Sequence, residues 1–111
     1  MATSELRPIR CTAGVAAKSI KNYIDDSLSD KTLLKRVNYV EICDYQYDGD
    51  TVRTQIDIVY KPLTDGQVVT PLLAGVPKVW YEVQAEALNT VFIRRPASTN
   101  VPFVLIVGIG R

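Results

Sequence analysis

The chain has 111 residues, of which 47% are apolar and 23% are charged, a composition typical of one globular domain and not of a disordered chain. Its net charge of +1 is too balanced to favour non-specific binding to nucleic acid. The charge is unevenly distributed, with +3 over residues 1–36, −4 over residues 37–66 and +2 over residues 67–111. Either ordinary surface variation or complementary contact between subunits explains this pattern.

The N-terminal third predicts an extended arm followed by a helix. Residues 1–12 are expected to be extended, because Pro8 does not fit a helix interior. Thr12 is a plausible N-cap for a helix over residues 13–29. Apolar residues recur there at helical spacing and form one stripe: Ala16, Ile20, Tyr23, Ile24 and Leu28.

Residues 34–111 favour β-structure. Residues 36–47 and 51–62 alternate between apolar and polar side chains, and Asp48-Gly49 between them is a typical two-residue hairpin loop. The predicted hairpin pairs residues whose numbers sum to 97, so that Tyr39 lies opposite Ile58. This register separates a mostly apolar face from a mostly polar one.

Glu41 is the exception on the apolar face of this hairpin, where it would lie opposite Ile56. A carboxylate in that position is explained either by a nearby sheet edge or by a bond to a partner. The pattern does not distinguish these two explanations.

Further strands follow along the chain. After a turn at residues 64–66, extended segments are predicted over residues 67–73, 76–83 and 90–95, with residues 84–89 able to form a helical turn. Residues 101–109 are apolar on both faces, which predicts a strand that is central in the fold or covered by another chain. The predicted fold is one mainly β domain over residues 1–111, a small antiparallel barrel or sandwich with one N-terminal α-helix.

The residue types argue against catalysis. The chain has no histidine, which removes the commonest general base and metal ligand, and excludes a triad of the Ser-His or Cys-His type. Cys11 and Cys43 match no metal-binding spacing. No phosphate-binding glycine loop is present, since Gly108 and Gly110 are followed by no helix. We therefore expect no enzymatic activity, no metal and no cofactor.

The sequence also gives expectations for the location of the protein and for the redox state of its cysteines. Residues 1–10 lack the apolar segment of a signal peptide, and the stretch from Val101 to Ile109 is far shorter than the roughly 20 residues of a membrane-spanning helix. No contact with a membrane is expected. The two cysteines could form one disulfide, although two buried free thiols in a reducing compartment are favoured.

Aromatic and arginine residues are the candidates for an interface. These side chains are the common anchors of protein–protein contacts. The candidates are Trp80, Tyr81, Arg94, Arg95 and Phe103.

An OB-like module that binds single-stranded nucleic acid is the alternative, because bases stack on aromatic rings. Arg53, Lys61, Arg94 and Arg95 could then contact phosphates. This alternative is not favoured, because the basic groove that such modules need is not evident.

One stretch, residues 65–80, resembles a known family. Its run Asp65-Gly66 followed by Pro71-Leu72 and Val76-Pro77 is similar to a segment of the OB-fold domain in phage baseplate and tail spike proteins. The resemblance extends over residues 15–83, and only Pro71–Pro77 is specific. The family usually has a Pro…Gly-Asp segment before its last strand, whereas this chain has Asn100-Val101-Pro102-Phe103.

The resemblance implies a structural or adaptor subunit of a phage virion, in the tail, baseplate or neck, and not the piercing tip. We expect it to form a homo-oligomer and to contact other virion subunits during assembly in the host cytoplasm. The N-terminal arm and the C-terminal strand are expected to make these contacts by burial and strand addition.

Overall fold

The computed structural model describes residues 5–43, 56–60, 68–72, 77–95 and 100–110. Eight strands lie in these ranges: β1 (Glu5–Ala13), β2 (Lys18–Ser19), β3 (Val37–Cys43), β4 (Ile56–Tyr60), β5 (Val68–Leu72), β6 (Lys78–Tyr81), β7 (Val91–Arg94) and β8 (Val101–Ile109). The helix α1 (Ile20–Ser27) and the 3₁₀ turns η1 (Lys31–Arg36) and η2 (Ala85–Thr90) connect them. The protein is therefore mainly β, as predicted.

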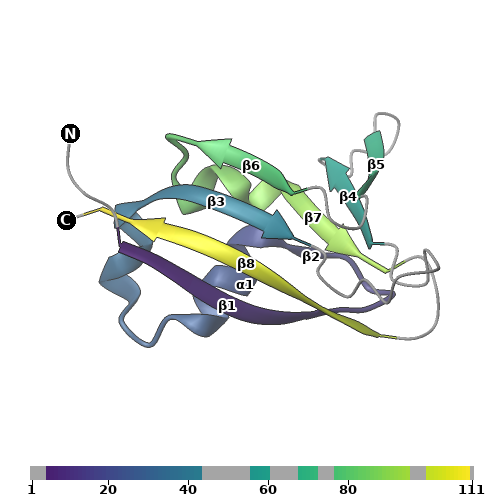
Figure 1. Ribbon diagram of the computed structural model, residues 1–111, viewed down its shortest axis with the longest axis horizontal. Coiled ribbons are helices and arrows are strands. Elements are labelled where there is room, and N and C mark those ends of the chain that lie inside the picture. Colours follow the sequence, from purple (N-terminus) through teal and green to yellow (C-terminus); the bar gives the residue numbers. More distant parts are fainter. Residues whose placement is uncertain (1–4, 44–55, 61–67, 73–76, 96–99, 111) are drawn as a thin grey trace.

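The strands form two antiparallel four-stranded sheets, ordered β1-β8-β3-β6 and β2-β7-β4-β5. Consecutive strands other than β4 and β5 alternate between the sheets, and the first strand pairs with the last, which is the order of an eight-stranded jelly roll. The described strands thus form a sandwich and not one closed barrel. Figure 1 shows β1, β8, β3 and β6 side by side, with α1 behind them.

One core joins the two sheets and the helix. Buried side chains of both sheets belong to the same apolar cluster, and Ile20 and Ile24 of α1 are fully buried in it. The ring of Tyr23 packs edge-on against Phe103 with 5.2 Å between centroids, and its hydroxyl donates to the carbonyl of Thr12 at 2.8 Å. The helix is therefore fastened to the first sheet by apolar packing and by a hydrogen bond.

The N-terminal boundaries differ from the prediction. Residues 5–13 are a strand paired along its length with β8, and not a free arm. The helix is shorter than residues 13–29, because Lys18 and Ser19 pair with β7 and the Ser19 hydroxyl caps the helix by accepting from the Asn22 amide at 3.1 Å. Sheet pairing on both sides of the bend at residues 15–16 overrides the helical spacing of Ala16.

The predicted pairing of residues 36–47 with residues 51–62 is wrong for the described parts of these segments. β3 pairs with β8 and β6, whereas β4 pairs with β5 and β7 in the other sheet. Tyr39 lies opposite Gly108 and Tyr81, and Ile58 opposite Thr70 and Ile93. The turn proposed at Asp48-Gly49 and the turn at residues 64–66 lie outside the described residues.

The later elements agree more closely with the prediction from the sequence. The strand predicted over residues 101–109 has the observed bounds of β8, and it is central in its sheet. β5, β6 and β7 fall within the predicted extended segments, and the ambiguous residues 84–89 form most of η2. The apolar pattern is a better guide to which residues are extended than to which strands pair.

Candidate assembly surface

Strand β8 carries apolar side chains on both of its faces. Phe103, Leu105 and Val107 point into the core and are fully buried. Val104 and Ile106 alternate with them, so they point to the opposite side and are only partly buried. One strand therefore contributes to the core and to a surface.

The strand register extends this surface across the whole sheet. Residues directly opposite each other on antiparallel strands share a face, so the partners of Val104, Ile106 and Gly108 lie on the same side. We call the resulting surface the outer face. Its described members are Leu6, Pro8, Arg10 and Thr12 of β1, Pro102, Val104, Ile106 and Gly108 of β8, Tyr39 and Glu41 of β3, and Val79 and Tyr81 of β6.

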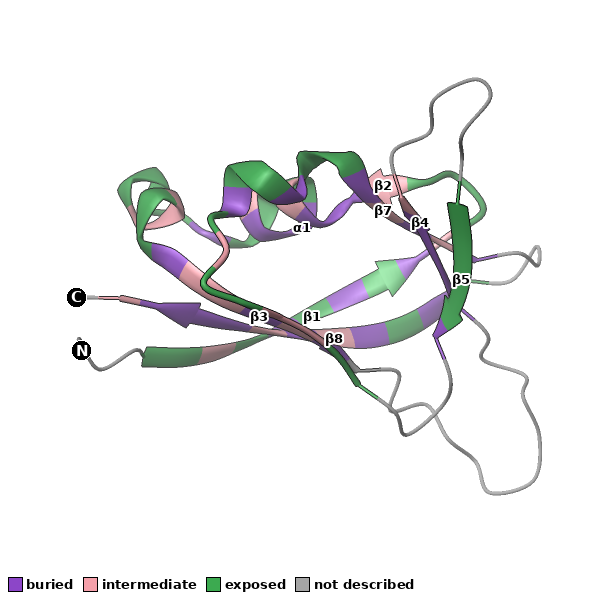
Figure 2. Cartoon of the chain, turned by 90° about the horizontal axis from the view of Figure 1, so that it is seen from above, coloured by how far each residue is buried: buried purple, intermediate pink, exposed green. Residues whose placement is uncertain are grey.

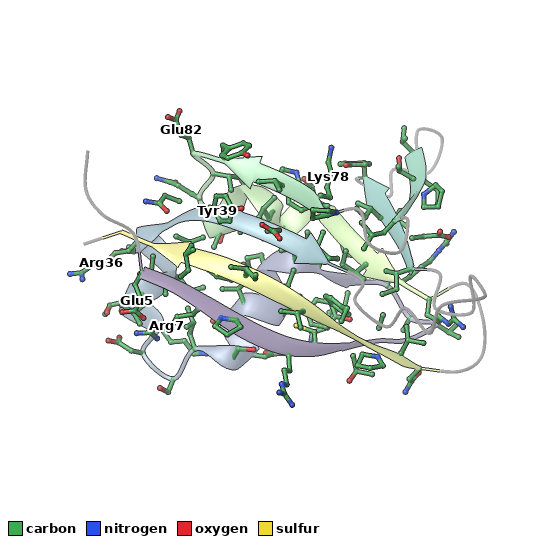
Figure 3. The ribbon with its side chains drawn as sticks, viewed as in Figure 1. Glu5, Arg7, Arg36, Tyr39, Lys78 and Glu82 are labelled. Atoms are coloured by element: carbon green, nitrogen blue, oxygen red, sulfur yellow. The ribbon has the colours of Figure 1, made fainter. Side chains whose placement is uncertain are left out.

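The helix and 3₁₀ turns that the structure describes lie on one side of this sheet. Figure 2 shows α1 and the 3₁₀ turns on the side opposite the outer face, and Figure 3 shows the outer face towards the viewer, with Tyr39 on it. No described helix or strand covers the outer face. Leu6 and Tyr81 leave 61% and 74% of their surface exposed there. An apolar patch of several side chains that faces solvent is typical of a contact surface.

Gly108 brings the strands of the outer face into close contact. A Cβ atom at this position would lie 2.8 Å from the Cβ of Tyr39 and 3.5 Å from the Cδ2 of Leu6. The absence of a side chain on Gly108 therefore makes room for the tyrosine and the leucine on either side. This close approach supports a continuous surface from β1 to β3.

Tyr39, Glu41 and Tyr81 form an ordered polar and aromatic cluster on the outer face. The Tyr39 hydroxyl donates to Glu41 Oε1 at 2.7 Å, and its ring packs edge-on against Tyr81 with 5.6 Å between centroids. The hydrogen bond to Glu41 is the main cause that raises the pKa of Tyr39 to about 12. Two aromatic rings and a carboxylate are thus held in fixed orientations on this face by contacts within the chain.

The sheet edges are poorly suited to strand addition. An edge is blunted when it is very short or contains proline, which has no amide hydrogen to donate. β1 contains Pro8, β5 contains Pro71, β2 has two residues and β6 has four. All four edges in the described part of the chain have one of these properties, so its faces are better suited to contacts than its edges.

Strand β8 cannot add to a partner sheet as predicted. Both of its edges are already paired, with β1 on one side and β3 on the other. The segment expected to be an N-terminal arm is one of these two neighbours from residue 5 onward. Burial against the outer face, and not strand addition by β8, remains available for assembly.

No protein-family model matches the chain, and no curated protein matches its sequence. The chain is similar to a solved structure described in the words "Bacillus endospore appendages form a novel family of disulfide-linked pili". The two share 17% sequence identity with a TM-score of 0.45, and the alignment covers 99% of this chain and 90% of the other. A similarity of this size establishes neither a family nor a function.

The five predicted interface residues do not come together. Tyr81 lies on the outer face, but Trp80 alternates with it and packs against the core from the other side of β6, with the Lys78 ammonium 6.0 Å from its ring centroid. Phe103 is fully buried, so its ring has no surface to offer. Because side chains alternate between the two faces of a strand, Trp80 and Tyr81 point to opposite faces of β6, although both are predicted interface residues.

The two predicted arginines lie in the second sheet or directly after it. Arg94 of β7 lies 3.8 Å from Asp57 of β4, and only 35% of its side chain is exposed. Arg95 is 7% exposed, and its amide donates to the carbonyl of Gly14 at 2.6 Å. Neither arginine contributes to the outer face.

The nucleic-acid alternative gains little from this arrangement. Of its four phosphate-binding candidates, Arg94 is paired with Asp57 and Arg95 is buried. Arg53 and Lys61 lie outside the described residues. The two described candidates therefore do not form a basic groove beside exposed aromatic rings, as binding of single strands requires.

The sequence pattern does not predict the outer face as a whole, although it predicts one part of it. The sequence predicted that residues 101–109 are apolar on both faces, and this pattern includes Val104 and Ile106. Leu6 and Tyr39 carry no such signal, because only the pairing of β1 and β3 with β8 places them beside these residues. Glu41 lies at the centre of the sheet and not at its edge.

The other features of the described chain are weaker candidates for a functional site. A hollow of about 470 Å³ between α1, η1 and η2 is lined by Lys21, Lys31, Lys35 and Glu86 among others, but Lys21 and Lys31 already pair with Glu86 and Asp25. Within the described ranges there is no group of three residues suited to bind a metal, and no helix long and apolar enough to span a bilayer. Cys11 is a buried free thiol, and its burial raises its pKa to about 12.

Proposed function

We propose that the protein is a non-enzymatic structural subunit that assembles with other subunits through its outer face. The observation that carries this proposal is the apolar surface of β1, β8, β3 and β6 that no described helix or strand covers, with Ile106 near its centre and exposed Leu6 and Tyr81 at its margins. Burial of apolar surface is the main driving force of protein association.

The proposed setting is a phage virion, assembled in the host cytoplasm. Jelly rolls are common in viral capsid proteins, and they also occur in lectins and cupins, so the fold alone does not choose among these functions. The absence of histidine removes the commonest metal ligand that a metal-dependent jelly-roll enzyme would use. The sequence resemblance of Pro71–Pro77 to a segment of phage spike proteins motivates the virion setting, although the observed strand order is that of an eight-stranded jelly roll and not of the five-stranded OB-fold.

Light scattering tests assembly directly. The mass of the purified protein is measured across a concentration series at low and high salt. We expect an oligomer that survives high salt, because apolar burial is not screened as exposed ion pairs are. Ile106→Lys should shift the protein to the monomer, and Leu6→Lys, at a more exposed position, should do so without risk to the core.

Val68→Lys is the matched control, because Val68 is 56% exposed on β5 in the other sheet. It should leave the mass unchanged. Loss of the oligomer in Val68→Lys, with no change in Ile106→Lys and Leu6→Lys, would contradict assembly through the outer face.

The virion setting needs its own test. Purified particles from the producing host should contain the chain at a constant ratio to the other particle proteins, as measured by mass spectrometry. Its absence from particles would contradict the virion proposal while leaving assembly through the outer face intact.

A further inference from the structure

The outer face carries one anion and one cation among its described residues. Glu41 lies on β3 in the interior of the sheet, and Arg10 lies on the edge strand β1. Glu41 is partly buried and accepts the Tyr39 hydroxyl, whereas no ion pair joins Arg10 to another described residue. Every other described member of the face is apolar or uncharged.

Any partner that covers this face must compensate the charge of Glu41. A carboxylate that loses its water without gaining a cation destabilises a complex strongly, and removing one member of a buried ion pair costs about 3–5 kcal/mol. The hydrogen bond from Tyr39 satisfies only part of the carboxylate. The partner surface therefore needs a basic group surrounded by apolar residues. The outer face itself meets this requirement around Arg10.

The strand register allows two copies of the chain to make the Arg10–Glu41 contact reciprocally. Arg10 pairs with Val104 and Glu41 pairs with Ile106, so the line between them crosses β8 between these two residues. The strand spacing and the rise per residue put their Cα atoms roughly 12 Å apart, too far for a direct pair within one chain. A two-fold axis across that line, in the plane of the interface, would place each Arg10 over the Glu41 of the other copy.

We infer that the outer face binds a second copy of this chain, packed face to face about a two-fold axis over β8, with reciprocal Arg10–Glu41 pairs on either side of an apolar centre. This inference rests on the proposed function and names the partner. Val104 and Ile106 then meet their own counterparts at the axis, and Leu6 and Tyr81 lie further out. An apolar centre with polar groups around it is the usual anatomy of a protein interface.

Reversal of each charge tests the inference. Arg10→Glu and Glu41→Arg should each weaken dimerisation at least about tenfold, since each places like charges opposite one another at two symmetric positions. Sedimentation velocity across a concentration series measures the dissociation constant. Arg7→Glu is the control, because Arg7 lies on the same strand but pairs with Glu5 and does not belong to the outer face.

A mixture of the two single variants gives the decisive result. In a dimer of one Arg10→Glu chain with one Glu41→Arg chain, one symmetric position pairs two introduced charges of opposite sign and the other restores the original pair. A 1:1 heterodimer close to wild-type affinity, formed from two variants that do not self-associate, would confirm the two-fold arrangement. It would also show that both variants are folded.

Other outcomes separate this inference from the proposed function. If both charge variants dimerise like wild type while Ile106→Lys is monomeric, the reciprocal pairing is wrong and assembly through the outer face stands. If the mixture does not recover affinity although circular dichroism shows folded variants, the two-fold arrangement is also overturned. A wild-type protein that is monomeric at all concentrations would overturn the second copy as the partner.

Discussion

The two faces of the sheet β1-β8-β3-β6 carry similar apolar residues, but these residues have different roles on each face. On the inner face, Leu105 and Val107 are completely buried against the helix and the second sheet. On the outer face, Val104 and Ile106 of the same strand are partly open to solvent. Side chains of the same type thus stabilise the fold on one side and are available for a partner on the other. Substitutions on each face should separate these contributions.

The largest effect is expected on the inner face. Leu105→Ala should lower the free energy of unfolding by about 2–5 kcal/mol, because it removes a fully buried side chain and leaves a cavity. Ile106→Ala, on the outer face next to it, should cost less than about 1 kcal/mol at concentrations where the protein is monomeric. Urea denaturation at low protein concentration measures both. Equal losses would contradict the difference between the faces.

Gly108→Ala should be the most disruptive small change on the outer face. The added methyl group would lie 2.8 Å from the Tyr39 Cβ, which is fixed to the backbone of β3. We expect a loss of about 1–3 kcal/mol from overpacking. Gly14→Ala is the matched control, since its methyl group would meet only the Asn100 side chain at 3.2 Å. Urea denaturation of both variants, with the larger loss in Gly14→Ala, would argue against close contact of β8 and β3 at this point.

Tyr23→Phe should produce a moderate effect. It keeps the ring against Phe103 but removes the hydrogen bond to the Thr12 carbonyl, which should cost about 1 kcal/mol. Burial raises the pKa of Tyr23 to about 12, so its contribution is present below pH 10 and is lost as the pH rises towards 12. The difference in unfolding free energy between the two proteins should therefore decrease above pH 10. A difference independent of pH would exclude a buried hydroxyl.

The two tyrosines distinguish the faces in another way. Both have a pKa of about 12, but burial is the main cause for Tyr23 and the hydrogen bond to Glu41 is the main cause for Tyr39. Glu41→Gln should therefore move the pKa of Tyr39 back towards 10 and leave that of Tyr23 unchanged. Titration of ring-labelled tyrosine by nuclear magnetic resonance resolves the two. A shift in Tyr23 would mean that the faces are not independent.

The smallest effect belongs to a surface pair that touches neither face. The Lys18 ammonium lies 2.6 Å from Asp26, and this hydrogen bond lowers the pKa of that carboxyl. Its stabilisation is present above the unfolded pKa and is lost as the pH falls through the folded one. The melting temperatures of wild type and Asp26→Asn should therefore converge on acidification from about pH 7 to about pH 2. Divergence would reverse the sign of the interaction.

The sequence indicates which segments are extended, but not how they are connected. Strand β8 could be bounded at Val101 and Ile109 because an apolar run ends at turn residues on both sides. The Asp48-Gly49 pair and the alternation of the segments on either side of it predict a hairpin between β3 and β4. In this fold they lie in different sheets, and alternation alone cannot say so, because it specifies faces and not neighbours.

The outer face could be predicted only in part for the same reason. The alternate apolar residues of β8 and the aromatic Tyr81 were visible in the sequence. Their combination with Leu6 and Arg10 depends on the pairing of the first strand with the last, which no local pattern encodes. Ser19 shows the same limit on a smaller scale, since it ends a strand pair and caps a helix at once.

The pairing of β1 with β8 has a consequence for how the protein is made. Chains are synthesised from the N-terminus, so β1 leaves the ribosome long before its only neighbour in the described sheet exists. Until residues 101–109 emerge, the apolar side chains that β1 contributes to the core stay exposed to water or bound to a chaperone. These are the side chains of Ile9, Cys11 and Ala13. Contacts between such distant segments also slow folding. The sheet should therefore close only after translation of β8, and a chain arrested before that strand should remain sensitive to protease.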